Sequence, residues 1–339
     1  MLVRFSLDPT ALPCESAEFR DGKLHRDVLR AWEDQGLLVH DGGAFWSRIE
    51  MFSDDLRKMW QLARERLPAE REPALAALPA WDAEPDLRSL AAIVEVVGVP
   101  EQRANRFGLT PECPSTRLSA TELEVCVLSE LAYTDRFERN TRLRNEPLKQ
   151  KWSMERVWNE RFALLASRSN RIEIFDRYCV EGLVKLQPGG LNTFLKLLDR
   201  HPRERVVNIV ASLPAGDVSL DQVDAAFERL VGTLKGDGVK EVRLFLTSSG
   251  NKWKKRGHDR FIVFQDAIVE MGSGLGAFGV TSVYKDTTFR VLSIRSSRGG
   301  AGTGAETASS HLDKIHTFQR DVTPRIYHPA RHRPPEDPL

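Results

Sequence analysis

The sequence predicts an α/β protein of two domains, whose second domain has a mixed, largely parallel sheet with helices on both faces. The first observation is size: 339 residues, 41% hydrophobic and 29% charged, is an ordinary globular composition with enough chain for two cores. The second is alternation. Apolar runs of strand length at 171–175, 206–211 and 241–246 are separated by helical patterns at 191–200 and 219–234. Such alternation is typical of parallel strands with helices on both faces of the sheet.

A polar break, Ser-Arg-Ser-Asn at 167–170, precedes the first of these strands. We place the domain boundary there, which gives a helix-rich α/β domain at 1–167 and the second domain at 168–296. Residues 297–339 are rich in glycine and serine and then in proline and arginine. They are predicted to be a flexible loop and an extended tail, with no more than a turn or two of helix.

The first domain shows a strand, several amphipathic stripes and capping signals. Its expected elements are a strand at 2–7, a helix at 23–35, strands at 37–40 and 44–49 around Asp41-Gly42-Gly43, a helix from 54 to 67, a connector at 68–85, and helices at 119–131 and 149–166.

The chemistry is concentrated at 252–278, KWKKRGHDRFIVFQDAIVEMGSGLGAF. A basic run leads to His258, two apolar segments form a strand pair, and a glycine-rich turn at 272–276 closes the unit. A neutral imidazole can attack a phosphodiester while fixed cations and backbone N–H groups hold the phosphate oxygens. His258 is the candidate nucleophile, and Arg260, two positions on, shares its face of the strand and can clamp phosphate. The structural alternative is that His258 only begins a strand.

The basic run supplies the densest positive charge in a chain whose net charge is only +1. It contains Lys252, Lys254, Lys255 and Arg256, with Trp253 as a possible stacking surface for bases. The alternative is a solvated basic loop. Because the run directly precedes His258, we expect it to bind nucleic acid.

Asp176 and Arg177 directly follow the strand at 171–175, which is the first of the second domain. Open α/β sheets bind ligands at the carboxyl ends of their strands. Both residues are therefore predicted to lie near His258 and to belong to its binding site.

Four residues of the motif carry a family resemblance. His258 and Arg260, with Gly272 and Ser273 at fourteen and fifteen positions after the histidine, resemble the HxKxxxxD...GSxN signature of the phospholipase D superfamily. Three positions depart from it: Arg260 replaces lysine, Gln265 replaces the aspartate with Asp266 one place later, and Leu275 replaces the asparagine. The form is closest to the single-motif branch, which includes the C-terminal domain of MIT-domain proteins and proteins of bacterial defence islands.

The resemblance implies a phospholipase D-like fold at 168–296 and a phosphodiesterase that needs neither metal nor cofactor. It assigns His258, Arg260, Asp266 and Ser273 to catalysis and the turn with Gly272 and Gly274 to phosphate binding. The resembled enzymes use two histidines, and this chain has one such motif, so the expected enzyme is a homodimeric nuclease. Phage defence, with partner proteins, is the setting that the resemblance suggests. The alternative is a catalytically degenerate module that binds phosphate, nucleic acid or a partner protein.

A third hypothesis places a metal nuclease of the PIN type in the first domain. Asp8, after the first strand, would be one Mg²⁺ ligand, with Glu122 and Asp135 as possible others. The simpler interpretation is structural, because Asp8 is followed by proline, a pattern that caps a helix or begins a turn.

The cysteines, at 14, 113, 126 and 179, have neither C-x-x-C spacing nor a histidine at zinc spacing. The N-terminus lacks the basic and apolar pattern of a signal peptide, and no apolar stretch approaches membrane-spanning length. These features predict a reduced, cytoplasmic setting with no membrane partner.

Overall fold

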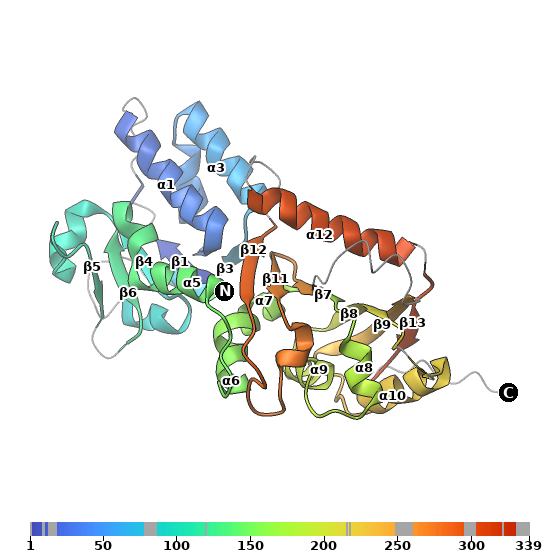
Figure 1. Ribbon diagram of the computed structural model, residues 1–339. Coiled ribbons are helices and arrows are strands. Elements are labelled where there is room, and N and C mark those ends of the chain that lie inside the picture. The colour runs from blue at the N-terminus through green and yellow to red at the C-terminus, as the bar shows by residue number, and fades with distance from the viewer. Residues whose placement is uncertain are drawn as a thin grey trace. The chain divides into compact units, whose positions relative to one another are not determined.

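The computed structural model describes residues 2–8, 11–12, 19–77, 87–118, 121–214, 216, 218–247, 260–294, 303–320 and 322–329 (Figure 1). The chain divides into two compact units, Leu2–Arg142 and Leu143–Leu339, each an α/β arrangement with its own sheet. The division falls earlier than the boundary expected at 167/168, because residues 143–168 pack into the C-terminal unit. Trp158 and Phe162 each meet Phe194 edge-on with ring centroids 6.0 Å apart.

The N-terminal unit holds a sheet with the order β3-β2-β1-β4-β6-β5, in which every neighbouring pair is parallel except β5 with β6. Its elements are β1 (Val3–Leu7), α1 (Phe19–Gln35), β2 (Gly36–His40), α2 (Ala44–Glu50), α3 (Asp54–Arg66), β3 (Ala69–Arg71), η1 (Pro73–Ala77), η2 (Ser89–Ala92), β4 (Val96–Val99), η3 (Glu101–Phe107), β5 (Ser115–Arg117), β6 (Glu124–Val127), η4 (Leu128–Tyr133) and α5 (Asp135–Asn145).

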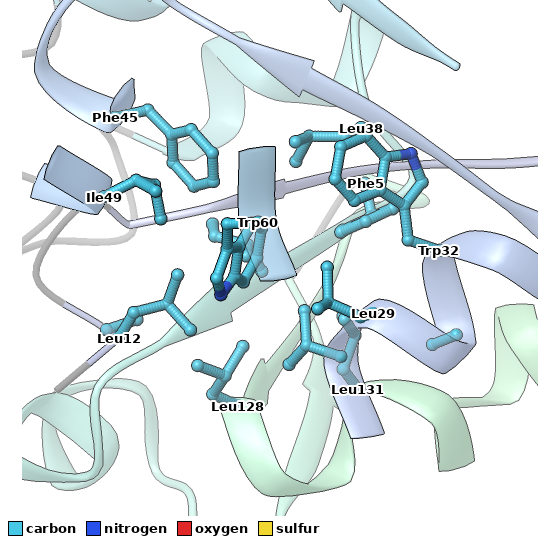
Figure 2. Packing of buried hydrophobic residues seen from close by; sticks show 14 of the residues in the cluster. Phe5, Leu12, Leu29, Trp32, Leu38, Phe45, Ile49, Trp60, Leu128 and Leu131 are labelled. Atoms are coloured by element: carbon cyan, nitrogen blue, oxygen red, sulfur yellow. The ribbon is translucent and has the colours of Figure 1, made fainter. Parts of the chain in front are cut away.

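Two tryptophans anchor the core on one face of this sheet. Trp32 of α1 and Trp60 of α3 are fully buried, and Figure 2 shows Trp60 among Phe45, Ile49 and other apolar side chains. Each indole N–H has a partner: Trp32 donates to the Pro68 carbonyl at 2.6 Å, and Trp60 donates to His25 Nδ1 at 3.0 Å. The stripes that predicted α1 and α3 are therefore core stripes, with the polar edge of each indole satisfied.

Two N-terminal predictions were wrong. Residues 44–49 form helix α2 rather than a strand, because Asp41 Oδ1 accepts the amides of Gly43 and Phe45 and so starts the helix. The helix expected at 119–131 is strand β6 followed by the 3-10 helix η4. Pairing with β4 outweighs the helical pattern of this segment. The buried carboxylate of Glu124 accepts the first amides of α5, those of Asp135 and Arg136.

The C-terminal unit holds a sheet with the order β12-β11-β10-β7-β8-β9-β13. Its elements are α6 (Met154–Val157), η5 (Trp158–Phe162), α7 (Ala163–Arg168), β7 (Arg171–Phe175), α8 (Cys179–Val184), α9 (Leu191–Asp199), β8 (Arg205–Ser212), α10 (Leu220–Gly232), β9 (Val239–Thr247), β10 (Phe261–Val263), β11 (Ala267–Met271), η6 (Gly274–Ala277), β12 (Phe289–Ser293), α12 (Thr303–Arg320) and β13 (Arg325–Tyr327).

Only β7, β8 and β9 are parallel in this sheet, and the other pairings among its described strands are antiparallel. The sheet is therefore mixed, as predicted, but it is not largely parallel. The reason is that the motif strands β10 and β11 are joined by a tight hairpin, which can connect only antiparallel neighbours.

Helices cover both faces of the sheet, as the alternation predicted. Helix α12 lies along one face, while α8, α9 and α10 lie on the other (Figure 1). On the α12 face, Phe175 stacks on Phe261 with centroids 4.9 Å apart, and Phe318 of α12 meets Phe175 edge-on. The predicted capping box of α10 is confirmed, with Ser219 and Gln222 each bonding the other's backbone amide.

The C-terminal segment was expected to be a loop and an extended tail. That expectation was wrong for 303–320, which form helix α12, while 325–327 are extended but pair with the sheet. Ala308, Ile315 and Phe318 are buried against the sheet, so an apolar face holds α12 in place. This face was missed in the sequence because the segment begins with a glycine- and serine-rich stretch. Strand β13 extends the sheet beyond β9, where Tyr327 donates its hydroxyl to Asp224 Oδ1 and Arg325 pairs with the same carboxylate. Of the helices described, none has the length and apolarity needed to cross a membrane.

Candidate functional site

A cavity of about 800 Å³ opens in the C-terminal unit beside the end of β7. Three segments frame it: residues 176–183, which lead from β7 into α8, residues 187–192 before and within α9, and residues 273–285 after β11. Arg260, at the start of β10, completes the wall. The volume is within the range of small-ligand sites, which is roughly 300–1,000 Å³.

Strand register explains why these segments meet. Phe261 of β10 is paired with Phe175 of β7, and the Met271 amide of β11 donates to the Arg260 carbonyl at 2.9 Å. The residue after β7, the residue before β10 and the residue after β11 therefore share one edge of the sheet. That edge holds the carboxyl ends of the parallel strands, where α/β sheets bind their ligands.

Asp176 is the buried hub of this edge, with 3% of its surface exposed. Its Oδ1 accepts the Tyr178 amide at 3.0 Å, and its Oδ2 accepts the Leu275 amide at 2.8 Å. Arg260 Nε lies 4.0 Å from Oδ1. Because a carboxylate accepts hydrogen bonds and repels phosphate, this geometry suits Asp176 to positioning Arg260 and the turn rather than to holding phosphate itself.

Burial raises the pKa of Asp176 above its ordinary value, although the two backbone hydrogen bonds and the charges of Arg260 and Lys285 oppose the rise. The folded protein therefore holds this proton more tightly than the unfolded chain does. Above the folded-state pKa of Asp176, its ionisation lowers the unfolding free energy by the full amount. This destabilisation disappears as the pH falls toward the ordinary pKa of aspartate.

This sign predicts the pH dependence of Asp176→Asn. As the pH falls from 8 toward the ordinary aspartate value of about 3.9, the unfolding free energy of the wild type is expected to rise relative to that of the variant, by at most about 1.4 kcal/mol per pH unit. Urea unfolding of both proteins at each pH measures the difference. Asp313→Asn, at an exposed position of α12, is the control and should show no such trend. A difference that is constant with pH, or that favours the variant at low pH, would contradict the inference.

Arg260 presents its guanidinium to the cavity from a fixed position. Its Nη1 donates to the Gly272 carbonyl at 2.5 Å, and its guanidinium carbon lies 4.8 Å from the centre of the Tyr178 ring. Its Nε is buried and has no hydrogen-bond partner in the structure. Such a held guanidinium is pre-organised for a phosphate oxygen.

The turn after β11 is built around two glycines. Gly274 has φ +56°, and a Cβ there would lie 2.1 Å from Asp176 Oδ2, so only glycine lets the turn approach the carboxylate. A Cβ on Gly272 would lie 2.3 Å from Thr288 Oγ1. Between them, the Ser273 amide donates to Thr287 Oγ1 at 2.7 Å, and Ser273 lines the cavity.

The structure brings together part of the predicted site. Arg260, Asp176 and Ser273 line the cavity, and Gly272 and Gly274 form its turn. Asp266 lies at the opposite end of the β10–β11 hairpin, where Arg168 Nε donates to it at 2.8 Å, and it does not line the cavity. Arg177 lies against the Tyr178 ring outside the lining. The remaining predicted residues, His258, Lys252, Trp253, Lys254, Lys255 and Arg256, fall outside the described residues.

Much of the lining was not predicted, including four polar side chains that could contact a ligand: Tyr178, Asn192, Tyr284 and Lys285. Tyr178 follows Asp176 and Arg177 directly, so its position was a usable signal. The other three come from segments with no motif, and only the tertiary fold brings them to the cavity.

No histidine lines the cavity among the residues that the structure describes. In the C-terminal unit, His201 accepts the Trp158 indole N–H at 3.1 Å, and His311 on α12 lies 2.6 Å from Glu270. These contacts fit histidines that serve packing rather than catalysis.

The acids proposed as a metal site in the N-terminal unit are each paired with a different arginine. Asp8 is buried and lies 2.5 Å from Arg103, Glu122 binds Arg136, and Asp135 binds Arg117. Within the described ranges, no three His, Cys, Asp or Glu side chains gather closely enough to hold a metal ion.

A comparison of the chain with known protein families finds no matching family model. A comparison with curated proteins finds no matching protein. Functional inference therefore rests on the cavity and on the sequence around it.

Proposed function

We propose that the C-terminal unit is a metal-independent phosphodiesterase that acts on nucleic acid, with a divergent phospholipase D-like site. The observation that carries the proposal is the meeting of Arg260, Asp176 and the 272–275 turn at one cavity. Asp176 is distant in sequence from the other two groups. Arg260 and the 272–275 turn belong to the motif that follows the basic run. A guanidinium, a tight glycine turn and a cavity at the carboxyl edge of the strands together suit a phosphate group.

In the proposed reaction, an imidazole nitrogen of His258 attacks phosphorus and the bond from phosphorus to the leaving oxygen breaks. The leaving oxygen takes a proton from a second histidine, and water then hydrolyses the phosphohistidine and restores both groups. Arg260 stabilises the charge on the phosphate oxygens, and Asp176 holds Arg260 in place. Because the sequence carries one such histidine motif, we propose that a second copy of the chain supplies the acid, in a two-fold symmetric dimer.

A second candidate function is nucleic-acid binding without cleavage. It is favoured by Leu275, which stands where the resembled enzymes have asparagine and whose side chain is buried. Unlike asparagine, a leucine side chain has no N–H to donate to a phosphate oxygen. The position of Asp266, far from the cavity, points the same way.

The test is cleavage of labelled single- and double-stranded DNA and RNA in EDTA, with the oligomeric mass measured on the same samples. We expect the wild type to cleave as a dimer and His258→Ala to lose at least about a thousandfold in rate, as loss of a nucleophile does. His316→Ala, at an exposed position of α12, is the matched control and should keep full activity.

Three outcomes separate the hypotheses. Binding that Arg260→Ala weakens, with no cleavage by any protein, would replace the enzyme with the binding module. Cleavage that EDTA and Asp8→Asn both abolish would move the activity to a metal site in the N-terminal unit. Cleavage in EDTA by a monomer would refute the shared dimer site.

A further inference from the structure

The mouth of the cavity carries exposed aromatic and apolar side chains. Tyr284 is 71% exposed, Val280 is also largely exposed, and Tyr178 is 39% exposed, yet all three line the cavity. A phosphate group gains nothing from such surfaces. They indicate that the ligand has a flat or apolar part beside its anionic part.

The segment that carries Tyr284 is tied down on both sides. The Gly279 amide donates to the Ser282 carbonyl at 2.9 Å, and the Tyr284 amide donates to the Ala277 carbonyl at 2.7 Å. Phe278 and Val283 are bridge partners in the same hairpin. The ring is therefore exposed on a braced backbone, which limits the entropy lost when a ligand stacks on it.

Lys285 follows Tyr284 and also lines the cavity, as Arg260 does from the start of β10. The two cations and the aromatic ring thus belong to one site. An anion bound by Arg260 and Lys285 would place an attached planar group within reach of Tyr284. Phosphate joined to a nucleoside has this combination of parts.

Asn192, in the first turn of α9, supplies a polar group without a partner. Its Oδ1 is buried and accepts no hydrogen bond in the structure, although Asn192 lines the cavity. The loop before it is packed tightly, since a Cβ on Gly189 would lie 2.3 Å from the Phe278 carbonyl oxygen and the Gly190 amide donates to that oxygen at 2.7 Å. A buried acceptor left unpaired is costly, so a rotation of the Asn192 amide that brings its oxygen into the cavity, against a ligand N–H, would be favourable.

We propose that the cavity binds one unpaired nucleotide of a single-stranded nucleic acid, with its base against Tyr284 and its phosphate on Arg260 and Lys285, and with a base N–H on Asn192 Oδ1 once that side-chain amide has rotated into the cavity. The proposal rests on the proposed function, because it assumes that Arg260 marks the phosphate position. In a duplex, both faces of a base are stacked and its N–H groups are paired, so a duplex base would have to leave the helix first. The site therefore selects single strands.

The test measures the binding of a fluorescent twelve-nucleotide single strand and of its duplex at fixed salt. His258→Ala is the background for every variant, so that turnover cannot disturb the equilibrium. We expect the single strand to bind at least about tenfold more tightly than the duplex, and Tyr284→Ala to weaken single-strand binding by about ten- to a hundredfold. Tyr284→Phe keeps the ring and should bind like the parent.

The matched control is Tyr133→Ala. Tyr133 is 69% exposed, close to the 71% of Tyr284, but it belongs to the N-terminal unit and does not line the cavity. Loss of single-strand binding in Tyr284→Ala, with no loss in Tyr133→Ala, supports the proposal. Asn192→Ala should weaken single-strand binding as well and leave duplex binding unchanged.

The proposal is overturned if Tyr284→Ala binds the single strand as its parent does, or if the duplex binds as tightly as the single strand. It is also overturned if the protein binds anionic phospholipid vesicles through Tyr284 and does not bind the oligonucleotide. If either of the first two results accompanies EDTA-resistant cleavage by the protein with His258 intact, the proposed function stands and only the nucleotide site fails. If the protein neither binds nor cleaves nucleic acid, both fail together.

Discussion

Gly274→Ala is expected to lower the unfolding free energy of the C-terminal unit by at least about 3 kcal/mol. The alanine would have to keep the left-handed backbone conformation of this position, at φ +56°, which residues with a Cβ rarely adopt. Its Cβ would lie 2.1 Å from Asp176 Oδ2 and 2.7 Å from Arg260 Cδ. Asp176 cannot move without a large energetic cost, because it is buried and already accepts hydrogen bonds from two backbone amides. The turn must therefore move away and lose the hydrogen bond from the Leu275 amide.

Gly276→Ala, two residues further along the same turn, is the control. A Cβ at Gly276 would meet nothing within 4 Å, so this change should alter the unfolding free energy by less than about 0.5 kcal/mol. Urea unfolding of the three proteins gives the comparison. Equal stability of the two variants would show that the turn adapts, and it would remove Asp176 as the hub of the site.

Gly274→Ala has a second expected effect if the cavity binds nucleic acid. Displacing Asp176 also displaces Arg260, which depends on it for position. Single-strand binding should therefore fall in Gly274→Ala at temperatures where the protein is still folded, while Gly276→Ala binds normally. This separates a misplaced site from an unfolded one.

Local signals in the sequence predicted the centre of the C-terminal unit well. Strands β7, β8, β9, β10 and β11 and the capping box of α10 appear where apolar runs, turns and Ser219 with Gln222 placed them. These apolar runs are short, rich in β-branched or aromatic residues and mostly bounded by turn signals, which favours strands over helices. The edge that gathers Asp176, Arg260 and the 272–275 turn follows from strand order alone.

Local signals failed where tertiary contacts decide. Leu123 to Val127 carry a helical stripe, but the segment is a strand because β4 offers it a parallel partner. Helix α12 begins in glycine and serine, so its apolar face becomes visible only against the sheet. Asn192 of α9 and Tyr284 and Lys285 of a loop reach the cavity from segments without motifs, and no spacing in the sequence connects them to Arg260.

Orientation was a further limit of the sequence. Asp176 was expected beside the motif and among its phosphate-binding groups, and the structure places it beside Arg260 as an acceptor. Which atoms face a ligand depends on the two amides that Asp176 accepts, those of Tyr178 and Leu275, and nothing in the sequence connects these amides to the carboxylate. Proximity was predictable from topology, but the role of the carboxylate was not.

Asp199→Ala is the other substitution with a large expected effect, at about 3–5 kcal/mol of unfolding free energy. Asp199, the last residue of α9, is buried and accepts four backbone amides from the segment that enters β9. Its Oδ2 accepts Lys235 at 2.6 Å and Gly236 at 3.3 Å, and its Oδ1 accepts Gly238 at 3.2 Å and Val239 at 3.0 Å. Alanine would leave these amides buried without that acceptor.

The surroundings of Asp199 leave little room for replacement of these bonds. A Cβ on Gly238 would lie 2.3 Å from the His201 carbonyl oxygen, so the segment already contacts the end of α9. Arg205 Nη1 donates to the Leu198 carbonyl at 2.7 Å, and burial lowers the pKa of Arg205 to about 10. Without Asp199, this buried guanidinium also loses its nearest opposing charge, which adds to the expected loss.

Asp199→Asn tests whether the acceptor count matters. The asparagine amide keeps one oxygen for two of the four donors and turns an NH₂ group toward the other two. The unfolding free energy of Asp199→Asn should therefore fall by less than that of Asp199→Ala. Asp313→Ala, at an exposed position of α12, should change stability by less than about 0.5 kcal/mol. If Asp199→Ala were as stable as Asp313→Ala, the amides of 235–239 would have found other acceptors, and the end of α9 would not be what fixes the start of β9.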